Sequence, residues 1–342
     1  MRAAVNAALD AAAVAPPSHD AFAFHRSLPG YAPTPVHDLD SLAMELGVAA
    51  VAVKDESDRL GLPAFKILGA SWAVERALRE AQAVHTLAAA SAGNHGRAVA
   101  RAAALRGLAC HVFLPARSLA VRREAIAAEG AEVVVVDGTY EDAVELAARA
   151  AREDGTALIA DVGDGGSAEW VIDGYATLFA EAAEQAAYDL IVVPVGVGSL
   201  AAAAARHGAR VGARVAGVEP DTAACLTASL AHGAPTRVAT PGTTMAGLDC
   251  AEVSAAAWPS LHRGIAGTVT VSDEEAAAAM RDLAAHGLAI GESGAAPLAG
   301  LRALQRDEDC RALREHLGVS GRTRVLLIAS EGRTATRDSG HR

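Results

Sequence analysis

The chain has 342 residues, of which 51% are hydrophobic and 21% charged, and its formal net charge is −11. This size and composition indicate a globular protein of about two domains. The negative charge argues against a nucleic-acid partner, because phosphate backbones are bound by basic surfaces. No apolar run reaches the roughly 18 residues that a membrane span requires, so no membrane role is expected.

The N-terminus and the cysteines argue for an ordinary cytoplasmic protein. The run Met1–Val5 does not begin a signal peptide, because it lacks the charged and apolar regions of one. Cys110, Cys225, Cys250 and Cys310 lie far apart, without a CxxC pair or a Cys/His cluster. We therefore expect reduced thiols, and neither a disulfide scaffold nor a metal site.

The chain begins with an expected lead-in arm over residues 1–35, in which Ala3–Val14 is predicted to form a short helix. Beyond it, short apolar runs alternate with helical patterns, which is typical of βαβ units and parallel sheet. Strands are expected at Ala50–Val53, Thr86–Ala90, Ala109–Leu114, Glu132–Val136, Ala157–Ala160, Leu190–Pro194, Arg214–Val218 and Val325–Ala329. Helices are expected at Ser71–Ala83, Gly96–Arg106, Val121–Glu129, Tyr140–Glu153 and Ala201–Arg206.

This alternation predicts an α/β fold of two domains, each with a central, mostly parallel sheet flanked by helices. The repetition is densest between residues 84 and 162, which we assign to a small domain inserted into a larger one. Residues 1–83 and 163–342 are assigned to the larger domain. The polar tail at 333–342 is expected to be disordered.

Lys66 is the first candidate for chemistry, because it stands among the apolar residues Phe65, Ile67 and Leu68 and is followed by Gly69. Burial lowers the pKa of a lysine and makes its amine a better nucleophile toward an aldehyde. A surface lysine at the start of a helix is the commoner interpretation of such a residue when it is taken alone.

A polar loop, Ser91-Ala92-Gly93-Asn94-His95-Gly96, joins a predicted strand to a predicted helix. Backbone N–H groups at such a junction can bind a carboxylate. Asn94 adds a neutral donor and acceptor that suits a phenolic oxygen. The alternative is a sharp turn in which the glycines serve geometry alone.

A second glycine-containing run, Gly196-Val197-Gly198-Ser199, follows the strand predicted at Leu190–Pro194. Two glycines let the backbone wrap a phosphate, and the following helix supplies N–H groups and partial positive charge. The run matches neither a Walker motif nor GxGxxG, so a dinucleotide site is not supported. A plain strand-to-helix turn is the alternative.

Two further loops complete the set of candidates. Ser330 follows the strand predicted at Val325–Ala329, where a hydroxyl can meet a pyridine nitrogen as a neutral partner. Gly291–Ala296 is another tight loop that enters a helix. An ordinary polar cap and a simple helix start are the respective alternatives.

Together, a desolvated lysine, a polar loop and a phosphate-sized backbone cradle are the parts that hold pyridoxal phosphate as a Schiff base. From about Pro33 to Gly332 the chain resembles the fold type II pyridoxal-phosphate enzymes, which include serine/threonine dehydratases, threonine synthase and cysteine synthase. Within them it is most similar to the diaminopropionate ammonia-lyases. The motifs that carry the resemblance are Val53–Ser57, Gly61–Lys66, Gly93–Arg97, Trp170 with Gly174-Tyr175, Val218–Pro220, Thr244–Cys250 and Gly291–Ala295.

The resemblance implies a role for each candidate. Lys66 would form the Schiff base and move the α-proton, and Phe65 would pack beside the cofactor. Asn94 would bind the phenolic oxygen, Gly196, Val197, Gly198 and Ser199 the phosphate, and Ser330 the ring nitrogen. Ser91, Ala92, Gly93 and His95 would bind the substrate carboxylate. A homodimer is also implied.

One position departs from the family pattern. Diaminopropionate ammonia-lyases generally carry an Asp immediately before Gly-Asn-His-Gly as a second acid/base, whereas this chain has Ala92. A second acid of the family matches Asp161, which could protonate or sense a leaving ammonia. A loop aspartate that caps the next segment is the alternative.

These observations lead to a β-eliminating ammonia-lyase that acts on a small amino acid, with L-2,3-diaminopropionate, pyruvate and ammonia as the expected substrate and products. A dehydratase of hydroxy amino acids and a β-replacement synthase are the enzymatic alternatives. A pyridoxal-phosphate-binding protein without turnover is the alternative from another class.

Overall fold

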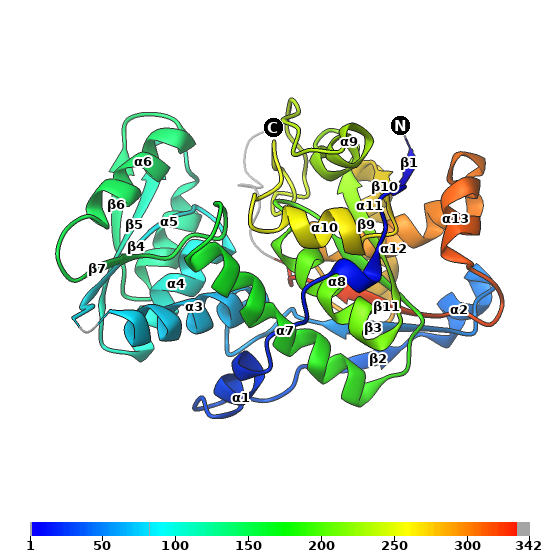
Figure 1. Cartoon of the computed structure of the whole chain (residues 1–342), viewed down its shortest axis with the longest axis horizontal. Coiled ribbons are helices and arrows are strands. Elements are labelled where there is room, and N and C mark those ends of the chain that lie inside the picture. The colour runs from blue at the N-terminus through cyan, green and yellow to red at the C-terminus, as the bar shows by residue number, and fades with distance from the viewer. Residues whose placement is uncertain (1, 82, 334–342) are drawn as a thin grey trace. The chain divides into compact units, whose positions relative to one another are not determined.

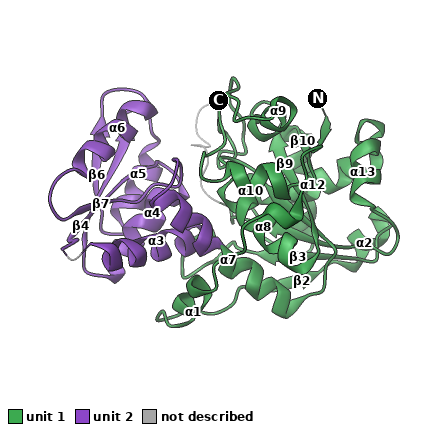
Figure 2. Cartoon of the chain, in the orientation of Figure 1, with its two compact units in different colours: residues 1–65, 176–342 green, residues 66–175 purple. Residues whose placement is uncertain are grey.

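The computed structural model describes residues 2–81 and 83–333 and has the α/β architecture expected from the sequence. Two compact units divide it (Figure 2): unit 1 comprises Met1–Phe65 and Ala176–Arg342, and unit 2 comprises Lys66–Tyr175. Each unit contains its own sheet with helices packed on it (Figure 1). No helix among the described residues combines the length and apolar character that a bilayer crossing needs.

Unit 1 is built on a seven-stranded sheet in the order β1-β10-β9-β8-β11-β3-β2. The five central strands are parallel, and the two edge strands pair antiparallel. Both faces of the central strands are covered, which is why these strands read as continuous apolar runs. The strands are β1 Ala3–Val5, β2 Val36–Asp38, β3 Ala50–Asp55, β8 Leu190–Pro194, β9 Arg214–Pro220, β10 Gly267–Val271 and β11 Arg324–Ala329.

Helix α12 (Glu292–Arg306) packs on this sheet and contacts four of its central strands. A Cβ atom at Gly300 of α12 would lie 2.4 Å from the Val218 side chain, so glycine permits this close approach. The other helices are α1 Asp20–Arg26, α2 Asp40–Leu46, α8 Ser199–Val211, α9 Cys225–His232, α10 Trp258–Gly264, α11 Asp273–Ala285 and α13 Arg311–Leu317, with single 3-10 turns at Ala11–Ala13 and Glu308–Cys310.

Unit 2 is built on a four-stranded parallel sheet in the order β6-β5-β4-β7. Its strands are β4 Thr86–Ala90, β5 Ala109–Pro115, β6 Glu132–Val136 and β7 Thr156–Leu158. Its helices are α3 Lys66–Glu80, α4 Asn94–Leu105, α5 Ala120–Ala127 and α6 Tyr140–Ala150, while α7 Ser167–Gln185 runs across the unit boundary. Unit 2 therefore repeats the strand-helix alternation that the sequence predicts.

Two glycines hold α3 against the N-terminal half of α7 within unit 2. A Cβ atom at Gly69 would lie 2.6 Å from the Tyr175 ring, and one at Gly174 would lie 2.5 Å from the Leu68 carbonyl oxygen. Glycine at both positions therefore lets the two helix backbones approach. This contact fixes the beginning of α3, where Lys66 lies.

The expected N-terminal helix over Ala3–Val14 is wrong. Residues Ala3–Val5 form β1, which pairs antiparallel with β10, and only Ala11–Ala13 makes a single 3-10 turn. The Asn6 amide also donates to the Ala266 carbonyl oxygen at 2.9 Å. Pairing with a sheet edge thus overrides the helix preference of an alanine-rich run, because propensity is a weak prior.

The expected helix Ser71–Ala83 begins earlier than predicted, at Lys66. The other predicted elements lie where the sequence placed them, with ends that differ by a few residues. The compact unit around the small sheet comprises 66–175, and within it α3 packs on α4. The expectation for the tail falls on residues 334–342, which lie outside the described residues.

A buried charge cluster formed by Lys54, Glu56, Arg59 and Glu181 lies at the end of β3 in unit 1, and its four side chains are fully buried. Lys54 Nζ donates to Glu181 Oε2 at 2.7 Å, and the Arg59 guanidinium donates to both oxygens of Glu181 at 2.7 Å. Arg59 Nε also donates to Glu56 Oε2 at 2.8 Å. Burial opposes ionisation of Glu181, but Arg59 and Lys54 outweigh it and lower the pKa of Glu181.

Glu181→Gln is expected to destabilise the protein by about 3–5 kcal/mol, because it leaves buried cationic charge without its partner. Urea unfolding measures the loss. Glu184→Gln, at an exposed position of the same helix, is the matched control and is expected to unfold like the wild type. Equal stability of both variants would contradict the role assigned to the cluster.

Candidate active site

Lys66 is the first residue of α3, and its ammonium is paired with a carboxylate in unit 2. Lys66 Nζ donates a hydrogen bond to Asp161 Oδ2 at 2.9 Å, and the two side chains are 21% and 15% exposed. Nζ also lies 5.9 Å from the centre of the Tyr175 ring. The lysine side chain is therefore neither fully exposed nor sealed in the core.

Asp161 lies in the loop that follows β7. Burial opposes its ionisation, but the attraction of His95 in its protonated form and the charge and hydrogen bond of Lys66 prevail and hold the pKa of Asp161 well below its usual range. Burial raises the pKa of the neighbouring Tyr175 hydroxyl far above its ordinary value. At neutral pH, Asp161 is therefore a carboxylate and Tyr175 a neutral phenol.

His95, the second residue of α4, lies against the same carboxylate. Its Nε2 is 3.0 Å from the Ile159 carbonyl oxygen, and its Nδ1 is 3.9 Å from Asp161 Oδ2. Nδ1 is buried and has no hydrogen-bond partner among the described residues. Burial lowers the pKa of His95, and this effect outweighs the attraction of Asp161.

The predicted polar loop leads from β4 into α4, and Asn94 is the first residue of that helix. The Gly93 amide donates to Ser91 Oγ at 3.3 Å. A Cβ atom at Gly96 would lie 2.1 Å from the Ser91 carbonyl oxygen, so only glycine lets the chain fold back there. Ala92 lies in this loop and contributes only a methyl group.

The predicted phosphate cradle joins β8 to α8 in unit 1. Gly198 has φ +91°, a conformation that L side chains rarely adopt, and it precedes the first helical residue, Ser199. A Cβ atom at Gly196 would lie 2.7 Å from the Gly247 carbonyl oxygen. The first N–H groups of a helix such as α8 have no intrahelical acceptor, so they suit an anion.

Ser330 follows β11 and is buried. Its carbonyl oxygen accepts a hydrogen bond from the Phe65 amide at 3.4 Å. Because β11 and β8 are neighbouring parallel strands, Ser330 and the Gly196 loop both lie at the carboxyl-terminal ends of the strands. Ligands of α/β proteins bind at such strand ends.

The structure thus sorts the predicted residues into two groups. In unit 2 it brings Lys66, His95 and Asp161 into one cluster, and the loop that contains His95 also carries Asn94, Ser91, Ala92 and Gly93. In unit 1 it places Phe65 beside Ser330 and puts Gly196, Val197, Gly198 and Ser199 after the neighbouring strand.

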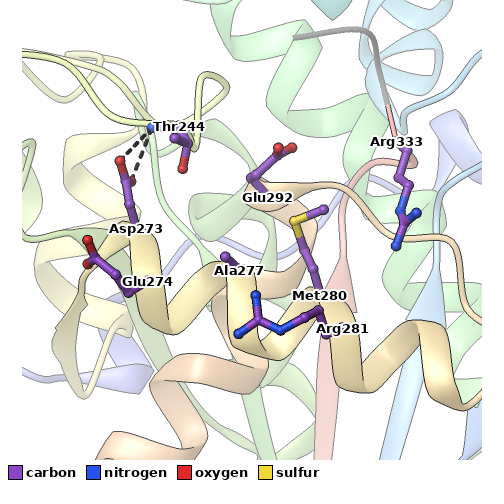
Figure 3. Close-up of a pocket in the computed structure, with 8 residues that line it drawn as sticks. All are labelled: Thr244, Asp273, Glu274, Ala277, Met280, Arg281, Glu292 and Arg333. Carbon is purple, nitrogen blue, oxygen red and sulfur yellow. Dashed lines mark hydrogen bonds between the residues drawn. The ribbon is translucent and has the colours of Figure 1, made fainter. Parts of the chain in front are cut away.

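A pocket of about 550 Å³ in unit 1 is lined mainly by residues of α11. Figure 3 shows the backbone amide of Thr244 donating to the Asp273 carboxylate in this pocket, at 3.1 and 3.0 Å from the two oxygens. The lining includes acidic and basic side chains. The complete set of lining residues is Thr244, Asp273, Glu274, Ala277, Met280, Arg281, Glu292 and Arg333.

Sequence reasoning assigned no role to Tyr175 or to the buried charge cluster. Tyr175 lies in the motif Trp170 to Tyr175, and two members of the cluster, Lys54 and Glu56, lie in Val53 to Ser57. A tyrosine eight residues into an amphipathic helix and a lysine inside a β-rich run give little local signal. Their partners lie 109 and 127 positions away in the sequence (175 − 66 and 181 − 54), so only the tertiary structure brings them together.

Comparison with known proteins gives this geometry its context. The family described as pyridoxal-phosphate dependent enzyme matches residues 27–330. A diaminopropionate ammonia-lyase of Salmonella typhimurium is 35% identical over 360 residues, which cover 93% of this chain and 89% of that protein. The biosynthetic L-threonine dehydratase IlvA of Escherichia coli is 30% identical over 273 residues, covering 79% of this chain and 52% of the relative.

A solved structure also shows similarity to a diaminopropionate ammonia-lyase. The crystal structure of diaminopropionate ammonia-lyase from Escherichia coli, in complex with an aminoacrylate-PLP azomethine reaction intermediate, superposes with a TM-score of 0.87. The sequence identity is 33%, and the match covers 97% of this chain and 94% of that one. The chain has the fold type II architecture and belongs to the family of pyridoxal-phosphate dependent enzymes.

The residues present fit this cofactor. A partly buried lysine amine suits an aldehyde, and the glycine loop leaves no room for a Cβ atom at Gly196, as a backbone cradle requires. The buried Ser330 offers a neutral hydroxyl at a strand end. The described residues contain no group of three or more His, Cys, Asp or Glu side chains that could hold a metal ion.

Asp161→Asn tests the ion pair through its pH dependence. Because the folded-state pKa of Asp161 is lowered, its stabilisation is present above the unfolded value of about 3.9 and is lost as the pH falls toward the folded value. In cofactor-free protein the variant is expected to be less stable than the wild type at neutral pH. The difference is expected to shrink progressively below about pH 4.

Chemical denaturation over a pH series measures this difference. Asp164→Asn, at an exposed position of the same loop, is the matched control and should follow the wild type throughout. A stability difference for Asp161→Asn that stays constant down to acid pH would show that the ion pair is not its source.

Proposed function

We propose that this chain is a pyridoxal-phosphate-dependent ammonia-lyase that converts L-2,3-diaminopropionate to pyruvate and ammonia. The observation that carries the proposal is the ion pair between Lys66 and Asp161, in a chain that matches a diaminopropionate ammonia-lyase over 93% of its length. An amine and a carboxylate 2.9 Å apart supply a proton acceptor and an anionic partner for a departing ammonium group.

The cofactor, when bound, withdraws electrons from the α-carbon of the substrate. Lys66 would hold it and would take the α-proton on Nζ. Phe65 would pack beside it, Asn94 would donate to its phenolic oxygen, and Ser330 would face its ring nitrogen. The cradle formed by Gly196, Val197, Gly198 and Ser199 would bind its phosphate through backbone N–H groups.

The substrate is bound by unit 2 in this proposal. The loop Ser91–His95, with Ala92 and Gly93, receives the α-carboxylate on backbone N–H groups. Asp161 faces the β-amino group and stabilises it as it leaves. In the overall reaction the Cα–H and Cβ–N bonds break, one water enters, and one 2-oxo acid and two ammonia molecules leave.

The organisation of the protein is part of the same proposal. The cofactor would be held mainly by the larger domain, and the strands within 84–162 belong to a smaller domain that moves. The family resemblance also suggests a homodimer, and the composition suggests the cytoplasm.

A dehydratase of serine- or threonine-like substrates is the second candidate, because a threonine dehydratase is 30% identical over 79% of this chain. It would use the same Lys66 but would release water in place of the first ammonia. A β-replacement synthase would transfer a nucleophile to the β-carbon instead. A protein that binds the cofactor without turnover would show cofactor absorbance alone.

The test is the release of 2-oxo acid from a panel of β-substituted amino acids by purified, cofactor-loaded protein. We expect 2,3-diaminopropionate to give the highest kcat/KM, with two ammonia molecules for each pyruvate. Preference for serine or threonine identifies a dehydratase, and product only with an added nucleophile identifies a synthase. Absence of turnover on every substrate would contradict the proposal.

Ala92 predicts a stereochemical preference. A methyl group cannot accept a proton, so no acid/base group stands at this position for the isomer whose α-proton points away from Lys66. A general base contributes about 10²–10⁴-fold to a rate, so kcat/KM for the L-isomer is expected to exceed that for the D-isomer by at least about 10²-fold.

Kinetics with both pure enantiomers measure this ratio. Ala92→Asp is expected to lower the ratio of kcat/KM between the L- and D-isomers. Ala92→Ser is expected to lower this ratio less, because its hydroxyl is a much weaker base. Equal turnover of both enantiomers by the wild type would contradict the assignment of Lys66 as the strong base at the α-carbon.

A further inference from the structure

A nitrogen of His95 and an oxygen of Asp161 face each other, and one proton could be shared between them. A carbonyl oxygen only accepts, so the 3.0 Å contact with Ile159 places a hydrogen on Nε2 of His95. In the neutral imidazole Nδ1 then carries a bare lone pair, and Nδ1 has no hydrogen-bond partner among the described residues. This lone pair lies 3.9 Å from an oxygen of Asp161.

Two facing acceptors cannot bond to each other unless one of them is protonated. A movement of about 1 Å at the end of the Asp161 side chain would bring the two atoms within hydrogen-bond distance. Protonation of one of these two atoms would therefore let them form a hydrogen bond. Such catalytic contacts commonly shorten only when substrate is bound.

Asp161 alone is a poor acid for a leaving amine. Its pKa is held well below the usual range, so it carries no proton at neutral pH. An amine that leaves carbon as ammonia nevertheless needs a proton on nitrogen if it arrives unprotonated. Asp161 thus stabilises positive charge on that nitrogen but cannot supply the hydrogen.

We propose that His95 supplies this proton through Asp161: Nδ1 takes up a proton from solvent and shares it with the carboxylate that contacts the leaving group. His95 is a positioning and proton-storing residue, since it acts through Asp161. The inference rests on the proposed function in that the leaving group is an amine. As the Cβ–N bond breaks, its electron pair stays on nitrogen, which receives the proton, and His95 returns to the neutral form.

The charges around His95 set when it takes up the proton. Burial lowers its pKa, Asp161 on the loop after β7 raises it, and Lys66 on α3 lowers it. Tyr175 on α7 interacts with Lys66 and Asp161 and remains neutral. The basicity of His95 therefore responds to the charge on the Lys66 nitrogen, which couples the proton store to the state of the catalytic amine.

His95→Gln removes the titrating nitrogen, and its amide can still donate to the Ile159 carbonyl oxygen. The decisive comparison uses two leaving groups: an amine, which needs a proton, and chloride in β-chloroalanine, which needs none. We expect kcat for 2,3-diaminopropionate to fall by about 10²–10³-fold more than kcat for β-chloroalanine. His111→Gln, at a half-exposed histidine on β5, is the control and should leave both rates unchanged.

Each outcome separates this inference from the proposed function. Equal losses on both substrates, or no loss on either, overturn the role of His95 while the ammonia-lyase activity stands. If the wild type acts on serine instead of diaminopropionate, the proposed substrate is wrong, and the same comparison is made between serine and β-chloroalanine. If His95→Gln folds poorly, His95→Asn replaces it, because neither amide titrates.

A second readout does not depend on turnover. In cofactor-free protein, nitrogen NMR of the His95 ring should show hydrogen on Nε2 when neutral. Its pKa should rise in Lys66→Met and fall in Asp161→Asn, because these variants remove a neighbouring cation and anion respectively. A hydrogen on Nδ1 of the neutral ring, or a His95 pKa insensitive to both changes, would overturn the inference.

Discussion

The contact between Lys66 and Asp161 is the interaction on which the account of this protein depends. It joins the first residue of α3 to the loop after β7 and holds a lysine amine at 2.9 Å from a carboxylate in a partly buried place. The carboxylate holds the amine in place by a hydrogen bond and by its opposite charge.

The fold positions the other proposed site residues in the same way in both units. In both units parallel strands end at a common edge, and the loops that follow β4, β7, β8 and β11 carry the proposed site residues. Glycine is required at several of these turns: Gly96 lets the chain fold back on Ser91, and Gly196 leaves room for the Gly247 carbonyl. The chemistry is therefore placed by loops that follow the strands of the two sheets.

Much of this was accessible from the sequence, because continuous apolar runs such as Leu190–Pro194 have few alternatives to a buried strand. The helix predicted in the alanine-rich N-terminus is wrong, because pairing with β10 and not helix propensity decides the structure of this segment. The approach of His95 to Asp161 and of Tyr175 to Lys66 was inaccessible, because each joins segments distant in sequence.

The central claim is that Lys66 binds the cofactor covalently, and reductive trapping tests it most directly. Protein loaded with pyridoxal phosphate is reduced with borohydride, digested, and mapped by mass spectrometry. The account predicts a phosphopyridoxyl group on the peptide that contains Lys66, and none on that peptide in Lys66→Ala. Labelling of Lys54 or of no lysine at all in the wild type would contradict it.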